Sequence, residues 1–337
     1  MGNGIDYKIY NYEISTYTSE DGAFFIISTQ QYLKTVIMQE LLNLYAECYD
    51  KWINNPPCGN NCPEYHYCRR CNLVEGDCSM CMAAIQRYGT IRAYPCSKIT
   101  YYYVMRFFNR FASEIEYVIR LINFRETIKL NVVSLGCGPG SEVYGIIHGF
   151  RHLGLTIRLD YLGYDLNPIW DDVQQMSINH LRNTGHNIGF SNTNMFTNFT
   201  QFDEQRVDLL VMNYLLSDYV MNSAQGTRHV FADEIIDFII QSNVKRVLFN
   251  DISLYGHNRQ LDSGVQMMEY IMNRLKFFGY TLRGTRLYFP DDRYVPNNRW
   301  WHQHDSGILL FVPMHNNPAN QGIVCCKSKQ VYFTITN

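Results

Sequence analysis

Two segments near the start of the chain carry apolar residues at helical spacing. In QQYLKTVIMQELLNLYAECYDKWI, large apolar side chains recur every three or four residues, which predicts an amphipathic helix that the prolines of NNPP end. These apolar positions are Leu33, Ile37, Leu41, Leu44 and Tyr45. The segment SKITYYYVMRFFNRFASEIEYVIRLINF predicts a longer helix with Ser97 as its N-cap. The residues before the first helix are mixed polar and aromatic and are expected to form a short strand pair.

From residue 130 onward, apolar runs of strand length alternate with helical patterns. Strands are predicted at 132–136, 160–165, 187–191, 207–213, 245–251, 281–289 and 306–313. Helical patterns lie between the first six, for example at 142–153, 168–183, 230–241 and 263–278. This alternation predicts a doubly wound α/β fold with a mostly parallel seven-stranded sheet, and the last two strands, which no helix separates, predict a terminal antiparallel hairpin. The expected domains are an N-terminal helical module at 1–129 and an α/β domain at 130–337.

Composition and charge narrow the possible functions. With 337 residues, 46% of them hydrophobic, the chain can bury a large core, and a net charge of −2 provides no global field for non-specific nucleic-acid binding. No apolar stretch reaches the length of a membrane span, and the N-terminus MGNGIDYK lacks the pattern of a secretory signal. We therefore expect an intracellular protein, cytoplasmic or nuclear, with no membrane partner and with disulfides disfavoured.

The first strand of the α/β region runs directly into a loop that contains three glycines. The segment VVSLGCGPGSE places Gly136, Gly138 and Gly140 two residues apart, and a helix is predicted to start at Ser141. Glycine allows backbone torsions that are closed to other residues and lets a ligand approach the main chain, and the helix start behind the loop offers unpaired N–H groups. The alternative is a tight turn that only joins the strand to the helix.

Polar side chains follow the next three strands. The segment YLGYDLNP places Asp165 at the end of its strand, where a carboxylate can accept two hydrogen bonds from a ribose diol. Asn194 in SNTNMF, and Asn213 with Tyr214 in LLVMNYLLSDY, follow the third and fourth strands. Because open α/β sheets bind ligands at the carboxyl ends of their strands, these side chains and the glycine loop are predicted to surround one crevice.

Together, VVSLGCGPGSE, YLGYDLNP, NTNMF and VDLLVMNYLLSD resemble the successive motifs of the class I S-adenosylmethionine-dependent methyltransferases. The resemblance covers about residues 130–313 and includes the terminal hairpin, which distinguishes that fold from a dinucleotide-binding Rossmann domain. It implies S-adenosyl-L-methionine as cofactor. The methionine moiety would lie on the glycine loop, the ribose on Asp165, and the adenine beside Asn194 and Met195.

One position departs from the family pattern. Ser134 stands where the first motif usually carries an acidic residue, and Glu142 or a group from the preceding helix is a candidate to replace that carboxylate. The cofactor-binding residues that the resemblance implies are Gly136, Cys137, Gly138, Pro139, Gly140, Glu142, Asp165, Leu166, Asn167, Asn194, Met195 and Asn213.

Methyl transfer requires few particular residues, because it depends mainly on aligning the nucleophile with the S–CH₃ bond. The chain has no Asn/Asp-Pro-Pro-aromatic motif after the fourth strand and no complete lysine-aspartate-lysine-glutamate tetrad, which weakens the case for exocyclic base amines and ribose 2′-hydroxyls as acceptors. The expected catalytic residues are Asn213, Tyr214 and Asp251, with Ser217 and Asp218 as further candidates. The alternatives are a helix cap or turn for Asp251 and a helix start for Ser217 and Asp218.

The segment RYVPNNRWWHQHDSG, at 293–307, concentrates aromatic and basic residues between the last two predicted strands. These residues are Arg293, Arg299, Trp300, Trp301, His302 and His304. Aromatic and arginine side chains together can stack on a nucleobase, anchor a protein interface, or simply pack inside a hairpin. The sequence leaves all three interpretations open.

Six cysteines fall within 24 residues, in CGNNCPEYHYCRRCNLVEGDCSMC. Their Cys-x₂-Cys and Cys-x₃-Cys spacings are typical of structural zinc sites in a reducing compartment. The predicted zinc ligands are Cys58, Cys62, Cys68, Cys71, Cys78 and Cys81, in an insert at 58–96 that also holds His66 and Cys96. Disulfides and an iron–sulfur cluster are the alternatives.

The leading hypothesis is an S-adenosylmethionine-dependent methyltransferase that acts on a macromolecular substrate, with RNA ahead of protein and a small molecule third. This order rests on the zinc insert and the aromatic segment at 293–307, which are also candidate surfaces for a protein partner. The alternative is a catalytically inactive scaffold or binding module of the same fold that uses the zinc insert as its partner surface. Ser134 and the lack of a defined catalytic motif favour this alternative, whereas the intact glycines and Asp165 oppose it.

Overall fold

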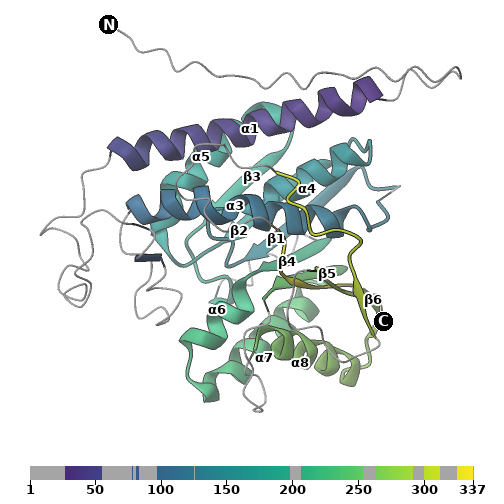
Figure 1. The fold of residues 1–337 in the computed structure, drawn as a ribbon. Coiled ribbons are helices and arrows are strands. Elements are labelled where there is room, and N and C mark those ends of the chain that lie inside the picture. The colour runs from purple at the N-terminus through teal and green to yellow at the C-terminus, as the bar shows by residue number, and fades with distance from the viewer. Residues whose placement is uncertain are drawn as a thin grey trace, which may run out of the picture.

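The computed structural model describes residues 27–54, 78, 81–82, 97–124, 126–197, 206–252, 263–290, 300–311 and 325–336, apart from the side chains of 27–38 and 197. Within these residues, one mixed sheet of eight strands carries helices on both faces (Figure 1). The strand order is β3-β2-β1-β4-β5-β8-β6-β7. The chain is therefore an α/β protein with a largely parallel sheet, as predicted, but the described residues form eight strands where the sequence predicts seven.

The first five strands form the parallel part of the sheet. Their bounds are β1 (Lys129–Leu135), β2 (Arg158–Tyr164), β3 (Asn187–Ser191), β4 (Leu209–Asn213) and β5 (Arg246–Asp251). Neighbours in the order β3-β2-β1-β4-β5 pair in parallel. On β1, Val132 belongs to the apolar cluster on one face and Val133 to the cluster on the other, while β4 is buried throughout. Continuous apolar runs such as LLVM are expected when both faces of a parallel sheet are covered.

The C-terminal strands differ from the prediction. They are β6 (Thr281–Tyr288), β7 (Trp301–Gln303) and β8 (Lys329–Thr336). The strand predicted at 306–313 is wrong, because residues 306–311 contribute only an isolated bridge between Ile308 and Cys325. β8 instead lies antiparallel between β5 and β6, and β7 pairs in parallel with β6 at the sheet edge. The antiparallel pair thus exists as β6 and β8, but β7 separates them in the sequence, so they do not form a simple hairpin.

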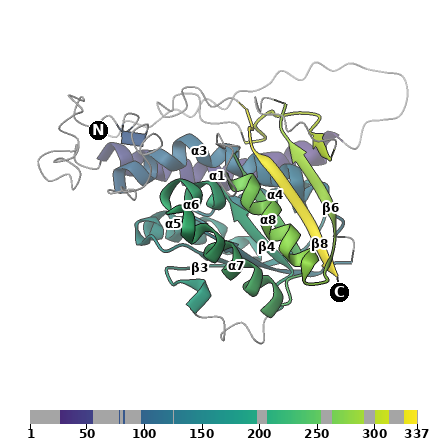
Figure 2. The same cartoon turned by 90° about the horizontal axis from the view of Figure 1, so that it is seen from below.

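Helices cover both faces of the sheet (Figures 1 and 2). One face carries α1 (Ile27–Asn54), α3 (Ser97–Ile119), α4 (Ser141–His152) and α5 (Asp171–Leu181). The other carries α6 (Leu215–Asn222), α7 (Gln225–Gln241) and α8 (Gly264–Phe277). Short 3₁₀ turns are η3 (Pro168–Trp170), η4 (Arg182–Thr184) and η5 (Met195–Thr197). Each layer has its own apolar cluster, so the sheet separates two hydrophobic cores.

Two glycines on α4 allow α3 to pack close against it. A Cβ on Gly145 would stand 2.5 Å from the carbonyl oxygen of Ala112, and a Cβ on Gly149 would stand 2.4 Å from Cγ2 of Ile119. Real Cβ atoms do not approach other atoms this closely, so α3 would have to move if either glycine were replaced. The position of α3 on the sheet therefore depends on these two residues.

The helices that precede residue 130 share a core with the sheet. Leu44 and Cys48 on α1 are fully buried in the same apolar cluster as Leu130 on β1. At the surface, Nζ of Lys51 lies 2.8 Å from a carboxylate oxygen of Asp172 on α5. Whether these helices form a separate folding module stays a prediction. No helix in the described part of the chain is long and apolar enough to cross a membrane.

Only part of the predicted zinc insert falls within the described residues. The predicted ligands outside them are Cys58, Cys62, Cys68 and Cys71, as are His66 and Cys96. Cys78 is 4% exposed and its sulfur accepts a hydrogen bond from Nε1 of Trp52 at 3.3 Å, while Cys81 packs against the same apolar cluster. Among the residues that the structure describes, no three His, Cys, Asp or Glu side chains gather as a metal site.

Candidate functional site

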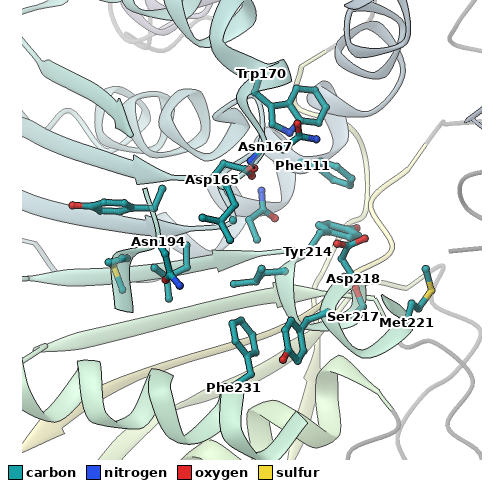
Figure 3. A pocket seen from close by; sticks show the side chains of 18 of the residues that line it. Phe111, Asp165, Asn167, Trp170, Asn194, Tyr214, Ser217, Asp218, Met221 and Phe231 are labelled. Atoms are coloured by element: carbon teal, nitrogen blue, oxygen red, sulfur yellow. Dashed lines mark hydrogen bonds between the residues drawn. The ribbon is translucent and has the colours of Figure 1, made fainter. Parts of the chain in front are cut away.

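A cavity of about 490 Å³ lies at the carboxyl ends of β1, β2 and β4 (Figure 3). Three groups of residues form most of its lining. The sheet wall is Gly136, Asp165, Asn194, Met195 and Asn213; the α3 wall is Tyr103, Phe107, Arg110 and Phe111; the α6 wall is Tyr214, Leu215, Ser217 and Asp218. The volume falls in the range of small-molecule sites, roughly 300–1,000 Å³. Trp170 on η3 and Phe231 on α7 also line the cavity.

The loop after β1 needs its three glycines because the backbone has positive φ angles at these positions. Gly136, Gly138 and Gly140 have φ angles of 58°, 50° and 80°, in the left-handed region that other residues rarely adopt. A Cβ on Gly136 would stand 2.5 Å from Cδ1 of Leu215, and a Cβ on Gly140 would stand 2.7 Å from the ring of Phe190. Side chains of this protein therefore fill the space that these two glycines leave.

The amides of this loop are hydrogen-bonded within the protein. The N–H of Gly138 donates to Oδ2 of Asp165 at 2.8 Å, and the N–H groups of Cys137 and Gly140 donate to main-chain carbonyls. The expected cofactor residues that do not line the cavity are Cys137, Gly138, Pro139, Gly140 and Glu142. Of the loop itself, only Gly136 reaches the cavity. We expected the whole loop to surround a ligand. In the structure the loop contributes Gly136 to the cavity and holds the side chain of Asp165 in place through the N–H of Gly138.

Asp165 follows β2 and faces the cavity. Besides the bond from Gly138, its Oδ1 accepts the N–H of Asn167 at 2.9 Å. Burial raises the pKa of this carboxyl, and the two backbone hydrogen bonds oppose that shift. Each carboxylate oxygen has a second lone pair, so Asp165 can accept hydroxyl groups of a ligand while it holds the loop. Asn167 caps η3 by accepting the N–H of Ile169, and Leu166 is 67% exposed beside it.

Glu142 lies beside Ser134, the position at which the sequence departs from the motif that it resembles. Oγ of Ser134 donates to Oε1 of Glu142 at 2.6 Å, and the hydroxyl of Tyr161 donates to the same oxygen at 2.7 Å. Glu142 is completely buried, and this burial raises the pKa of its carboxyl. A carboxylate from α4 therefore lies next to position 134. It stands outside the cavity lining, which argues against a direct contact with a ligand there.

The segment after β3 reaches the cavity with one polar and one apolar side chain. Asn194 is exposed and its Oδ1 accepts the N–H of Phe196 at 3.0 Å, at the start of η5. Met195 is 3% exposed and lies next to it in the cavity lining.

A buried hydrogen-bond network joins the end of β4 to α3. Oδ1 of Asn213 accepts from Nδ2 of Asn250 at 2.8 Å, and its Nδ2 donates to Oγ of Ser141 at 3.2 Å. The hydroxyl of Tyr214 donates to Oε2 of Glu114 at 2.9 Å. Burial raises the pKa of Tyr214 well above its usual range, so its hydroxyl stays protonated. Tyr214 also has a φ of 60°, which is uncommon for a residue other than glycine.

The three candidate residues Asp251, Ser217 and Asp218 occupy different places. Asp251 is 1% exposed and accepts the N–H groups of Ser217 and Ile252, both at 2.8 Å, so it caps α6 and does not line the cavity. This geometry corresponds to the helix-cap alternative and argues against catalysis by Asp251. Asp218 does line the cavity. Its side chain is solvent-accessible, yet desolvation by the protein atoms around it, together with the charge of Asp165, raises its pKa to about 6.

In the described part of the aromatic segment, residues 300–307, the aromatic side chains do not share one surface. Trp301 is 7% exposed and packs in the core, and His304 is also 7% exposed and hydrogen-bonds Oε1 of Gln330 at 2.7 Å. Trp300, in contrast, is 60% exposed. For Trp301 and His304 the packing interpretation therefore applies. His302 is exposed, and Arg293 and Arg299 lie outside the described residues.

Sequence analysis did not identify the α3 wall. Tyr103, Phe107 and Phe111 lie four residues apart on α3, and the rings of Phe107 and Phe111 stack with centroids 5.9 Å apart and planes at 9°. The ring of Tyr103 packs 5.2 Å from that of Trp170. Apolar residues at this spacing are typical of any buried helix face, so spacing alone cannot identify a ligand site. The available signal was Arg110, a cation within this aromatic run.

Comparisons with known proteins find no matching family model and no matching curated protein. Among solved structures, the chain is similar to the plantazolicin methyltransferase BpumL in complex with SAH, with 12% identity, a TM-score of 0.38, and coverage of 92% of this chain and 100% of that one. It is similar to magnesium protoporphyrin IX methyltransferase from Synechocystis PCC 6803 with bound SAM, with 12% identity, a TM-score of 0.37, and coverage of 66% and 78%. It is also similar to the human methyltransferase 10 domain containing protein, with 10% identity, a TM-score of 0.37, and coverage of 77% and 95%.

Proposed function

We propose that this chain is an S-adenosylmethionine-dependent methyltransferase whose cavity holds the methyl donor against the sheet wall. The supporting observation is that Gly136, Asp165, Asn194 and Asn213, which come from four separate segments of the sequence, line one cavity. The sheet adds support, because its antiparallel β8 lies between β5 and β6. An antiparallel pair at this edge is the feature that the sequence resemblance uses to separate methyltransferases from dinucleotide-binding Rossmann domains.

The residues of the sheet wall fit the chemistry of this donor. Asp165 retains acceptor capacity for a ribose diol. Asn194 offers a polar group and Met195 an apolar surface for the adenine, and Gly136 and Asn213 would flank the amino-acid end. When bound, the donor supplies a methyl group on a positively charged sulfur. The protein then has to hold donor and acceptor in line and exclude water.

Asp218 is the residue of the cavity best suited to accept a proton from the methyl acceptor. A base is needed when the nucleophile is protonated, and general bases work best with a pKa near the working pH. The pKa of Asp218 is raised to about 6, whereas Tyr214 keeps its proton and can only donate a hydrogen bond. We therefore assign the base to Asp218 and an orienting role to Tyr214, in place of the predicted Asp251.

Calorimetric titration with S-adenosylmethionine and S-adenosylhomocysteine tests this proposal. We expect both ligands to bind the folded wild-type chain. Asp165→Ala should weaken binding by roughly 1–3 kcal/mol, because the ribose loses a charged acceptor. The matched control is Asp160→Ala on β2, the strand that Asp165 follows, where the carboxylate pairs with Lys129 away from the cavity. Absence of heat with either ligand would contradict the proposal, and equal affinity in wild type and Asp165→Ala would show that the ribose lies elsewhere.

A non-catalytic scaffold is the second candidate function. It is favoured by the loop amides, which are hydrogen-bonded within the protein, and by the side chain of Leu215, which fills the space in front of Gly136. In that case the cavity would bind neither S-adenosylmethionine nor S-adenosylhomocysteine. The calorimetric titration with these two ligands therefore distinguishes the scaffold from the enzyme.

The RNA-before-protein order and the zinc site also stay proposals. Most of the zinc insert and residues 293–299 lie outside the described residues, and Cys78 and Cys81 are the predicted zinc ligands within them. The sulfur of Cys78 accepts a hydrogen bond from Trp52, which is compatible with a metal thiolate. Elemental analysis of the purified protein should find zinc at about one or two ions per chain. A folded protein free of metal would contradict the assignment.

A further inference from the structure

Arg110 stands among aromatic rings in the α3 wall. Its side chain is 14% exposed, and its Cζ lies 4.9 Å from the ring centroid of Phe111, 5.4 Å from that of Tyr214 and 5.5 Å from that of Phe107. An arginine in this position is pre-stacked, so little freedom is lost when a ligand binds to it. It presents a positive charge and a flat surface to the cavity.

Nε of Arg110 is buried and donates no hydrogen bond to any residue that the structure describes. The neighbouring carboxylate is Glu114, whose Oε1 is 3.7 Å from Nε of Arg110. That oxygen already accepts the N–H of Lys327 at 2.9 Å, and Oε2 accepts from Tyr214 and from Asn250. Glu114 thus already accepts three hydrogen bonds from other donors, and its 3.7 Å separation from Nε of Arg110 is that of an ion pair, longer than a hydrogen bond. A buried guanidinium N–H without a hydrogen-bond acceptor is costly, and a carboxylate or phosphate can bind a guanidinium with two parallel hydrogen bonds.

We infer that the α3 wall binds the methyl acceptor, and that this acceptor is a planar aromatic group that carries a carboxylate or a phosphate. The rings of Tyr103, Phe107 and Phe111 provide stacking surfaces for the planar group, and Arg110 binds its acidic substituent. The identity of the ligand as methyl acceptor rests on the proposed function. The preference for an anion rests on Arg110 alone.

Titration calorimetry with paired probes tests this inference on the full chain. The pairs are benzoate with benzamide, and uridine 5′-monophosphate with uridine, measured in the absence and in the presence of S-adenosylhomocysteine. We expect the acid of at least one pair to bind the wild type about 10- to 100-fold more tightly than its neutral partner. Preference in the benzoate pair points to an aromatic carboxylate, and preference in the uridine pair points to a nucleotide. Cyclohexanecarboxylate, which is not planar, should bind more weakly than benzoate.

Three variants make the test specific. Arg110→Met should abolish the preference for the acid, and Arg110→Lys should retain part of it, because lysine keeps the charge but loses the bidentate fork. Arg110→Met should still fold, since Glu114 keeps all three of its hydrogen-bond donors. Arg106→Met is the matched control, because Arg106 lies on the same helix and beside the ring of Phe107 but outside the cavity lining. It should bind like the wild type.

Several results would overturn the inference. They are equal affinity for acid and neutral probes in the wild type, a preference that persists in Arg110→Met, and absence of binding by every acid probe at millimolar concentration. Thermal unfolding of each variant shows whether it is folded. If S-adenosylhomocysteine does not bind but the preference depends on Arg110, the proposed function fails and the anion site stands. If S-adenosylhomocysteine binds without any such preference, the anion site fails and the proposed function stands.

Discussion

The sheet wall and the α3 wall of the cavity differ in how their polar groups are satisfied. In the sheet wall, Asp165 accepts two backbone N–H groups and Asn213 is hydrogen-bonded through both its oxygen and its nitrogen. The polar groups of the sheet wall are therefore hydrogen-bonded without a ligand, and Asp165 offers a ligand only its remaining lone pairs. In the α3 wall, Arg110 has an ion pair with Glu114, but its Nε–H has no hydrogen-bond acceptor among the described residues.

The two walls also differ in what holds them. The sheet wall stands on strands that are buried on both faces, so its geometry follows from the parallel sheet. The α3 wall stands on one helix whose position depends on Gly145 and Gly149 of α4. A change in helix packing should therefore alter the α3 wall more than the sheet wall.

Gly145→Val gives the largest expected effect. Its side chain would meet the carbonyl oxygen of Ala112 at a distance no real contact allows, so α3 must shift, and we expect a loss of about 3 kcal/mol in the free energy of unfolding. Denaturant unfolding measures this loss. The control is Gly226→Val, where nothing lies within 4 Å of the added Cβ, and it should stay within about 0.5 kcal/mol of the wild type.

The same variant tests the comparison of the two walls. In Gly145→Val, the preference for acidic probes should fall much more than the affinity for S-adenosylhomocysteine, because the shift displaces α3 and leaves the strand ends in place. Equal losses in both would show that the walls depend on each other.

Asp251→Asn is expected to change how stability depends on pH. Burial raises the pKa of Asp251 from 3.8 to about 7, so the native state retains a proton that the unfolded chain has already released. The free energy of unfolding of the wild type should therefore fall as the pH rises from about 4 to about 8, by on the order of 4 kcal/mol from this group. The variant lacks this titration and should show a flatter profile. Parallel profiles would contradict the assignment of Asp251 as a buried cap of α6.

Tyr214→Phe gives the smallest effect. It removes one hydrogen bond to Glu114, which keeps the bond from Asn250, so we expect a loss of about 1 kcal/mol in the free energy of unfolding. The affinity for S-adenosylhomocysteine should change little. Tyr219→Phe is the control, because its hydroxyl makes only a long, exposed bond to the carbonyl of Thr227. If both variants behaved alike, the network between α6 and α3 would not contribute to stability.

The sheet wall could be predicted from the sequence because it follows from strand order. Asp165 and Asn213 come directly after apolar runs, and the carboxyl ends of parallel strands meet at one edge of the sheet. The direction of each group's hydrogen bonds could not be predicted. Nothing in GCGPG indicates that the loop amides bond to Asp165 and to the loop itself.

The α3 wall and β8 could not be predicted for different physical reasons. The aromatic residues of α3 have the spacing of any core-facing helix, so their exposure to a cavity depends on tertiary packing. The run GILLFVP at 307–313 is as apolar as a typical strand, so it competes in the sequence with 329–336 for the place beside β5. Which of the two segments pairs with β5 depends on tertiary packing, which local propensity does not reveal. Val331 and Phe333 on β8 fill the core beside β5, whereas Ile308 is 70% exposed.

A crystal structure of the chain with S-adenosylhomocysteine tests the division of the cavity most directly. The ribose hydroxyl groups should lie within hydrogen-bonding distance of the Asp165 carboxylate, the amino-acid end should lie near Asn213, and the space in front of Arg110 should stay open for an acceptor. A ligand that lies against the α3 wall, or a cavity without ligand at saturating concentration, would contradict this account.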